Sequence, residues 1–196
     1  LRYRDEAPWP EAADGDGYSL VFSANFGSSD PDEGINWRAS REIGGTPGAE
    51  DTISIDAWRN ERFSEEELAS PIISGNTADP DGDGLNNQLE YIFATDPKQA
   101  NAEPVTISWE YDPEDADNPG IYQTFALQVS SSLDAVEISL NSSPDLSNWS
   151  ADEPGTSHEF IGSERIDANS RRLLFRTSQP AGSATTTFYR FSFSLQ

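Results

Sequence analysis

Three aspartates at alternating positions are the residues of this chain whose types and spacing specify a chemistry. Asp79, Asp81 and Asp83 stand at positions 1, 3 and 5 of the segment DPDGDGLNNQLE. Gly84 follows at position 6, and Glu90 closes the segment at position 12. Calcium is a hard cation that takes roughly six to eight oxygen ligands, and carboxylates in this order around a glycine are typical of a calcium-binding loop.

The other ligands of this loop follow from the same spacing. Leu85 at position 7 offers its backbone carbonyl, and Asn87 at position 9 offers a side-chain oxygen. Gly84 permits the sharp turn, and Glu90 can give two oxygens. The sequence therefore predicts a Ca²⁺ site, against the alternative of an acidic turn that holds no ion. Its predicted ligands are Asp79, Asp81, Asp83, Leu85, Asn87 and Glu90.

The segments that flank the loop predict how it is held. The apolar residues after it recur at helical spacing and predict an exit helix that ends before Thr95. They are Leu85, Leu89, Ile92 and Phe93. Ser64 followed by Glu67 is typical of a capping box at the start of a short helix. The residues at 74–76, Ser-Gly-Asn, predict a turn into the loop with no entering helix. A lone loop that joins two segments is therefore expected, rather than a paired EF-hand sensor.

The stretch from Trp58 to Pro97 resembles a linker found in exported proteins of verrucomicrobial-type bacteria. The matching pattern is ADPDGDGLxNxxEYxxxTDP, which begins here at Ala78. Such linkers carry a thrombospondin type 3 or dockerin-like calcium loop. The resemblance implies a helical linker over residues 58–99 that a calcium ion stabilises.

Residues 1–57 are rich in glycine, proline and acidic turns, and Tyr18 to Ser23 is their clearest predicted strand. The phrases APWPEAADGDGYSL, NWRAS and GGTPG resemble the closing part of a lamin-tail domain, a small immunoglobulin-like β fold. The resemblance implies a partial β segment whose missing strands come from sequence outside this stretch or from another chain. The matching residues are Pro8, Trp9, Pro10, Asp14, Gly15, Gly17, Ser19, Leu20, Asn36, Trp37, Ser40, Gly45, Thr46, Pro47 and Gly48.

Residues 100–196 alternate apolar and polar side chains in several short runs, which predicts an antiparallel β sandwich. In the last run, Tyr189, Phe191, Phe193 and Leu195 fall on one face. The phrases SSPDLSNW and FYRFSF resemble the C-terminal β domain that follows the calcium linker in the same proteins. The predicted fold class is thus mainly β, in three parts: 1–57, 58–99 and 100–196.

The amino-acid composition disfavours some classes of binding partner. Twelve basic residues stand against 35 acidic ones, which gives a net charge of −23 and makes nucleic-acid binding unfavourable. No run approaches the roughly 20 apolar residues of a membrane helix, so membrane insertion is not expected. The chain has no cysteine and therefore no disulfide or thiolate site. A single low-affinity calcium loop is useful where calcium is abundant, which favours an extracellular or cell-surface location.

Other residues give weaker signals. His158 is the only histidine, but no GxSxG motif accompanies it, so a loop or strand-end position is favoured over a catalytic triad. Among the tryptophans, Trp37, Trp109 and Trp149 are expected to pack, and Trp9 is the best candidate for an exposed sugar-stacking ring. Further acidic clusters read as solvated turns rather than as second cation sites. They are Asp14 with Asp16, Asp30 with Asp32 and Glu33, and Asp112 with Glu114, Asp115 and Asp117.

Three function classes remain. The favoured one is a non-catalytic, calcium-stabilised structural or interaction module. Its partial β segment predicts strand addition by a neighbouring copy and, through it, self-association into an extracellular homopolymeric fibre. The second is a carbohydrate-binding accessory module of a polysaccharide-degrading enzyme, which requires a row of solvent-facing aromatic rings. A hydrolase ranks last, because the sequence offers no nucleophile, no base and no catalytic metal constellation.

Overall fold

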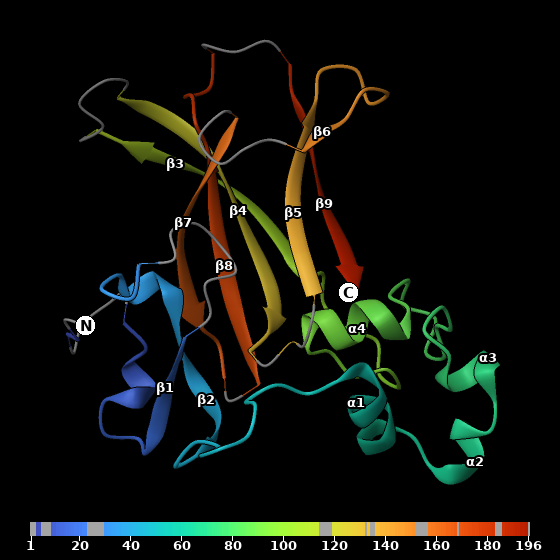
Figure 1. The fold of residues 1–196 in the computed structure, drawn as a ribbon. Coiled ribbons are helices and arrows are strands. Elements are labelled where there is room, and N and C mark those ends of the chain that lie inside the picture. Colours follow the sequence, from blue (N-terminus) through green and yellow to red (C-terminus); the bar gives the residue numbers. More distant parts are fainter. Residues whose placement is uncertain are drawn as a thin grey trace.

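The protein is mainly β, and its sheets are antiparallel, which confirms the predicted fold class. The computed structural model describes residues 3–4, 9–22, 30–113, 119–131, 133, 136–151, 157–167, 169–182 and 186–195. In chain order, a pair of strands is followed by short helices and then by a group that has seven strands in the described residues; Figure 1 shows the helices to one side of the first pair, below the end of the C-terminal strands. None of the helices in these ranges is long and apolar enough to cross a membrane.

The C-terminal strands form two sheets that pack face to face. One sheet has the strand order β3 (Val105–Asp112), β4 (Gly120–Ser130), β8 (Ser170–Thr177), β7 (His158–Arg165). The other has the order β6 (Ser150–Ala151), β5 (Val136–Ser143), β9 (Phe188–Leu195). Aromatic pairs join the two sheets: the rings of Phe125 and Tyr189 lie 5.0 Å apart, and those of Phe175 and Phe191 lie 5.5 Å apart. This arrangement is the predicted antiparallel sandwich.

The alternation along the strands explains this packing. On β4 and β8, Leu127, Val129 and Leu173 are fully buried, while their neighbours along each strand are more exposed. Because Phe125 lies opposite Phe175 in the strand register, both rings point into the same inner face. The row of aromatic residues predicted on β9 faces this core.

The N-terminal segment forms a small two-stranded sheet of β1 (Tyr18–Phe22) and β2 (Trp37–Ile43). One-turn 3₁₀ helices at Glu11–Ala13 and Gly34–Asn36 precede β1 and β2. The predicted strand at 18–23 is confirmed, whereas β2 was not predicted. Trp9 stacks on Trp37 with ring centroids 6.1 Å apart. A Cβ atom at Gly34 would lie 2.7 Å from the Trp9 ring, so only glycine allows this close approach.

Four short helices connect this sheet to the sandwich. They are α1 (Ile55–Arg62), α2 (Glu65–Leu68), α3 (Pro71–Ser74) and α4 (Asn87–Phe93). The capping box of Ser64 and Glu67 at α2 and the exit helix α4 confirm the predictions. Two expectations were wrong. The sequence ISI at 53–55 favours a weak strand, but Ile53 forms a single bridge with Leu133 and α1 begins at Ile55, because Ser54 caps it. The turn expected before the loop is partly α3, which begins with a proline at its first position.

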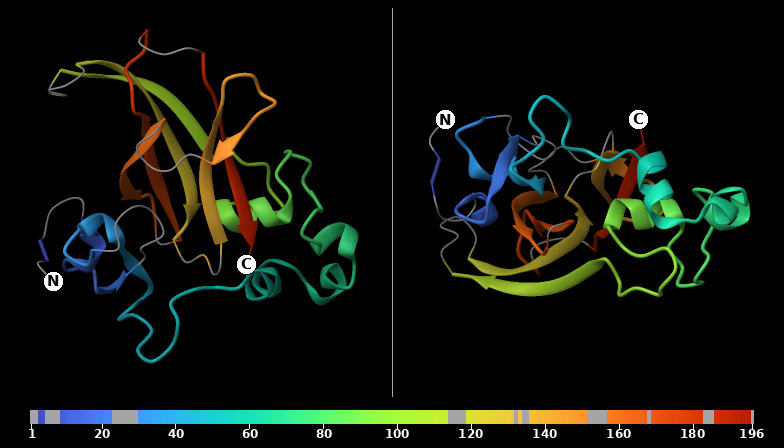
Figure 2. Two further views of the ribbon diagram at one scale, coloured as in Figure 1. Left: turned by 45° about the horizontal axis from the view of Figure 1, so that its top comes forward. Right: turned by 90° about the horizontal axis from the view of Figure 1, so that it is seen from below.

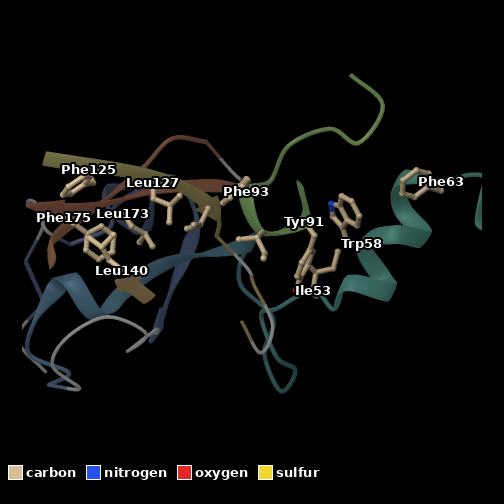
Figure 3. Packing of buried hydrophobic residues seen from close by; sticks show 12 residues of the cluster. Ile53, Trp58, Phe63, Tyr91, Phe93, Phe125, Leu127, Leu140, Leu173 and Phe175 are labelled. Atoms are coloured by element: carbon tan, nitrogen blue, oxygen red, sulfur yellow. Dashed lines mark hydrogen bonds between the residues drawn. The ribbon is translucent and has the colours of Figure 1, made fainter. Parts of the chain in front are cut away.

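The linker helices and the sandwich share one hydrophobic core (Figure 3). The Tyr91 hydroxyl donates a 2.7 Å hydrogen bond to the carbonyl of Ile53, and the Tyr91 ring meets Trp58 edge-on at 5.9 Å. At the C-terminal end of α4, the Phe93 ring lies 5.3 Å from the Phe193 ring of β9. The helix that follows the predicted calcium loop is therefore packed against the end of the sandwich, and it does not form a separate unit.

Two tryptophans lie where the sequence did not predict them. Trp109 was expected to pack, but 59% of its surface is exposed, because β3 is an edge strand and its distal half extends with β4 away from β5 and β9 (Figures 1 and 2). Trp9 was expected to be exposed, but it is 5% exposed because Trp37 and the backbone at Gly34 enclose it. Alternation identifies the two faces of a strand, but which parts of a face are covered depends on the tertiary fold.

Candidate metal centre

The three aspartates of the DPDGDG segment converge as predicted. Asp79, Asp81 and Asp83 each offer a carboxylate oxygen within 4.8 Å of the others. Their carboxylate oxygens also accept backbone N–H groups of the same loop. Asp79 accepts from Gly82 at 2.8 Å and from Gly84 at 3.1 Å, and Asp81 accepts from Asp83 at 3.1 Å. The loop thus curls around its own carboxylates, and this curl brings their oxygens together.

Two glycines make the curl feasible. Gly82 has φ of 78° and Gly84 has φ of 96°, in the left-handed region that favours glycine. Gly84 at position 6 is the glycine that the calcium-loop pattern requires. The next residue, Leu85, donates its N–H to Asp83 at 2.8 Å, and its carbonyl is the predicted position-7 ligand.

Glu90 lies on the first turn of α4 and is fully buried. Its Oε1 accepts a 3.3 Å hydrogen bond from the side-chain amide of Asn101, whereas its Oε2 is buried without a hydrogen-bond partner among the described residues. A buried carboxylate is normally paired or bound to a metal, because removing a charge from water is costly. The position of Glu90 in the core therefore calls for a positive partner.

Asn87 closes the base of the loop. Its side-chain amide donates to the carbonyls of Ile73 and Gly75, each at 2.8 Å, and its backbone N–H donates to Ala78 at 2.9 Å. These bonds join the end of α3 to the start of α4. Asn87 Oδ1 is buried and has no partner within the described part of the chain, so an acceptor at position 9 remains available.

Asn101 belongs to the site, and sequence reasoning missed it. Its backbone N–H donates to Asp83 Oδ2 at 2.8 Å, and its side-chain amide lies 3.5 Å from the same oxygen. The amide also donates to the carbonyl of Asp96 at 3.1 Å. Asn101 thus connects the loop carboxylates to the strand that begins at Val105. It lies 18 residues from Asp83, outside any loop pattern, so no spacing rule could find it.

The electrostatics of the site favour a bound cation. Burial, followed by the negative charges of Asp81, Asp83 and Asp79, raises the pKa of Glu90 to about 8. Burial and its two acidic neighbours also raise the pKa of Asp81. The N–H groups of Asn101 and Leu85 instead lower the pKa of Asp83. A divalent ion would reverse the first two effects, because an opposite charge favours the ionised carboxylates.

Three of the predicted ligands share a further property. Each has one buried oxygen that accepts no hydrogen bond from the described residues: Asp81 Oδ2, Asn87 Oδ1 and Glu90 Oε2. A buried acceptor without a partner costs about 1–3 kcal/mol, and more when it is charged. All three atoms belong to hard oxygen donors of the kind that calcium takes. The residues present therefore fit a calcium ion.

Other sequence candidates do not gather in the same way. Within the described ranges, Asp79, Asp81 and Asp83 form the one group of at least three acidic or histidine side chains close enough to share an ion. Residues Glu114, Asp115 and Asp117 lie outside the described residues. His158 is the first residue of β7, is buried, and meets the ring of Phe175 at 6.2 Å. This is the strand-end position that the sequence favoured.

Comparison of the chain with protein-family models, with curated proteins and with solved structures finds no match. The resemblances to a lamin-tail domain, to a calcium linker and to its C-terminal β domain therefore stay predictions.

Proposed function

We propose that this chain is a non-catalytic structural module that a calcium ion stabilises and that acts outside the cell or on its surface. The observation that carries the proposal is the buried carboxylate of Glu90, with one oxygen unpartnered, beside three converging aspartates. Asp79, Asp81 and Asp83 would hold the ion, and Glu90, whose carboxylate lies outside their group, would complete the set with the Leu85 carbonyl and Asn87 once the ion draws it in. The extracellular assignment follows from where a single loop of modest affinity finds enough calcium.

The position of the site supports a stiffening role. Asn101 joins the loop to the approach to β3, and α4 packs against β9 through Phe93. An ion that draws Glu90 and the aspartates together would therefore fix the linker against the base of the sandwich. Ligand binding to the folded state stabilises it in proportion to the logarithm of the ligand concentration over Kd.

Calcium binding is tested directly by titration calorimetry and thermal unfolding of the whole chain. We expect one ion with a Kd of roughly 10⁻⁵ to 10⁻³ M. At a hundredfold excess over Kd the stabilisation is about 2.7 kcal/mol, which for a chain of this size raises Tm by about 5–10 °C. Asp81→Asn should weaken binding at least tenfold, whereas Asp14→Asn removes the same charge elsewhere and should not. Absence of calcium uptake, with Tm unchanged by a chelator, would contradict the proposal.

Assembly through an exposed strand is part of the proposed role. β1 and β2 form a short sheet with a register shift, whereas the edge strand β3 is longer and regular, so we assign strand addition to β3. Its eight residues keep one uninterrupted register with β4, and six of them are exposed. Its sequence VTISWEYD holds no proline, glycine or lysine, the residues that block edge pairing. We infer that a second copy pairs with this edge.

A two-fold axis at Trp109 would make this edge self-complementary. Antiparallel pairing of β3 with its copy would place Trp109 opposite Trp109 and Ile107 opposite Tyr111. Glu110 would then face Ser108, so no two carboxylates of the strands would be opposed. The exposed apolar row of Ile107, Trp109 and Tyr111 would continue across both copies. The net charge of −23 opposes association, and salt should therefore strengthen it.

The alternative function, a carbohydrate-binding accessory module, is favoured by the same row. Trp109 and Tyr111 are 59% and 67% exposed on one face of β3, as sugar stacking requires. However, their neighbours on this face include Ile107 and Ile121, which offer no hydrogen bonds to sugar hydroxyls. Strand pairing is therefore the better explanation of the row.

The variant Trp109→Lys separates these functions. We expect the wild-type chain to associate in light scattering as salt rises, and Trp109→Lys to stay monomeric although it lowers the net negative charge. Ile72→Lys is the matched control, because Ile72 is an exposed apolar residue on α3, away from β3. Because the chain has no cysteine, Trp109→Cys should form a disulfide-linked dimer in the paired register, and Ile72→Cys should not. The alternative would be supported if the wild-type chain stays monomeric and is retained in glycan-containing gels, and Trp109→Lys is not retained.

A further inference from the structure

A buried arginine that has no ion-pair partner among the described residues lies outside the calcium loop. Arg171 is the second residue of β8 and lies in register with the fully buried Val129, on the inner face of the sheet. Arg171 is only 7% exposed, and its Nε is buried without a hydrogen-bond partner among the described residues. Within the described ranges, no carboxylate forms an ion pair with it.

The surroundings of Arg171 make this burial unfavourable. The nearest charged neighbour is Arg38 of β2, another buried guanidinium, which is already paired with Asp51. Burial, followed by repulsion from Arg38, lowers the pKa of Arg171 to about 10, and the side chain remains charged at neutral pH. A buried charge is retained in proteins where it is paired, so the geometry around Arg171 calls for an anion.

Arg171 lines a cavity of about 610 Å³ between the N-terminal segment and the end of the β7–β8 pair. The stacked rings of Trp9 and Trp37 form part of its wall, and Ser131 and Ser163 also line it. This volume lies within the range of small-molecule sites and is large enough for one or two sugar rings.

The charged residues that line the cavity determine how many negative charges a ligand can carry. Four carboxylates also line the cavity, and all four residues are solvent-exposed: Glu11, Asp16, Glu164 and Asp167. Glu164 is paired with Arg172 at 3.5 Å, and Asp167 accepts backbone N–H groups of its own turn. Exposed carboxylates are screened by water but still repel a polyanion. A ligand with one negative charge, directed at the buried guanidinium, fits this arrangement.

We propose that this cavity binds a hexuronic acid unit, a sugar that carries a single carboxylate. The carboxylate accepts two hydrogen bonds from the guanidinium of Arg171, as arginine commonly gives to carboxylates. The sugar ring lies against the Trp9–Trp37 wall, and its hydroxyls reach Ser131 and Ser163. This site does not depend on calcium, and it uses none of the residues of the calcium loop or of β3.

The test uses the whole chain with three probes: galacturonate, galactose and acetate. Calorimetry and thermal unfolding should show that galacturonate binds and raises Tm, while galactose and acetate at the same concentration do not. Arg171→Met should raise Tm without ligand, because it removes the unpaired buried charge, and should lose binding roughly ten- to hundredfold or more. Arg62→Met, at an exposed arginine of α1 that does not line the cavity, should bind galacturonate as the wild type does.

Two further measurements keep the outcome decisive. Arg171→Lys keeps the charge but loses the planar fork, so it should fold and bind galacturonate more weakly than the wild type. Chelation of calcium should leave galacturonate binding in place, which separates this site from the calcium proposal. The proposal is overturned if acetate protects as well as galacturonate, which would indicate an adventitious ion only. It is equally overturned if galactose binds as tightly, or if Arg171→Met retains full affinity.

Discussion

Glu90→Gln is expected to stabilise the calcium-free protein and to abolish the stabilisation that calcium gives. In the calcium-free state, Glu90 is a fully buried acid whose charge is disfavoured by burial and by three aspartates. The neutral amide removes that charge and keeps the shape of the side chain. In the calcium-bound state, the same substitution removes a charged ligand. One change thus has opposite effects under the two conditions, which a merely structural glutamate would not produce.

The pH dependence gives the size of this effect. The pKa of Glu90 is raised from 4.5 to about 8 in the folded state, so the folded protein holds this proton more tightly than the unfolded chain. The stability that protonated Glu90 contributes is therefore fully present below pH 4.5 and is lost as pH rises toward 8. Each pKa unit corresponds to about 1.4 kcal/mol, so the shift from 4.5 to about 8 gives a total loss on the order of 5 kcal/mol.

Urea unfolding between pH 5 and pH 9, with and without calcium, measures this effect. In chelator, the wild type should lose stability steeply across the range, and Glu90→Gln should not. In calcium the wild type should lose this slope, because the ion favours the ionised carboxylate. Glu66→Gln, at an exposed position of α2, is the matched control and should follow the wild type. Identical pH profiles for the wild type and Glu90→Gln in chelator would show that Glu90 is not the destabilising group.

Asp51→Asn is expected to destabilise the protein by about 3–5 kcal/mol, the usual cost of breaking a buried ion pair. Asp51 pairs with Arg38, and both side chains are at least nine-tenths buried. The same carboxylate accepts the backbone N–H of Arg41 at 3.0 Å, which secures β2 to the loop that leads to α1. Without it, the guanidiniums of Arg38 and Arg171 remain near each other, both buried and unpaired.

Chemical denaturation and limited proteolysis would measure this loss. Cleavage should begin in the N-terminal segment, because the charge is lost where that segment meets the sandwich. Asp56→Asn is the control: this residue pairs with Arg59 at 2.7 Å, but its side chain is 81% exposed, so a change below about 1 kcal/mol is expected. Adding Arg38→Met to Asp51→Asn should restore much of the stability, since no unpaired charge then remains at that position. A loss with Asp51→Asn no larger than that of Asp56→Asn would show that the pair contributes little.

Local spacing predicted the loop and its helix well. The positions of Asp79, Asp81, Asp83 and Gly84 determine a curl that is formed by hydrogen bonds within six residues. The capping box of α2 and the apolar periodicity of α4 are equally local, which explains why both helices were found. The long strands of the sandwich were found for a similar reason, because alternation along one strand is visible without its neighbours.

Features that depend on distant contacts could not be predicted. Asn101 reaches Asp83 only after α4 has turned the chain back, and Arg171 is buried only because the N-terminal segment covers it. The strand β7 was missed, since its residues are mainly polar and it is placed by pairing with β8. The exposures of Trp9 and Trp109 were reversed because one is covered by another segment and the other extends past the opposing sheet.

The sharing of one core by α4 and the sandwich has a consequence for the order of folding events during biosynthesis. Without calcium, folding has to bury Glu90, either charged or newly protonated, inside the same cooperative unit as β4, β8 and β9. Under the proposed function, such a chain is less stable until it binds calcium. Ion uptake would then stabilise the linker and the sandwich together, in a single step.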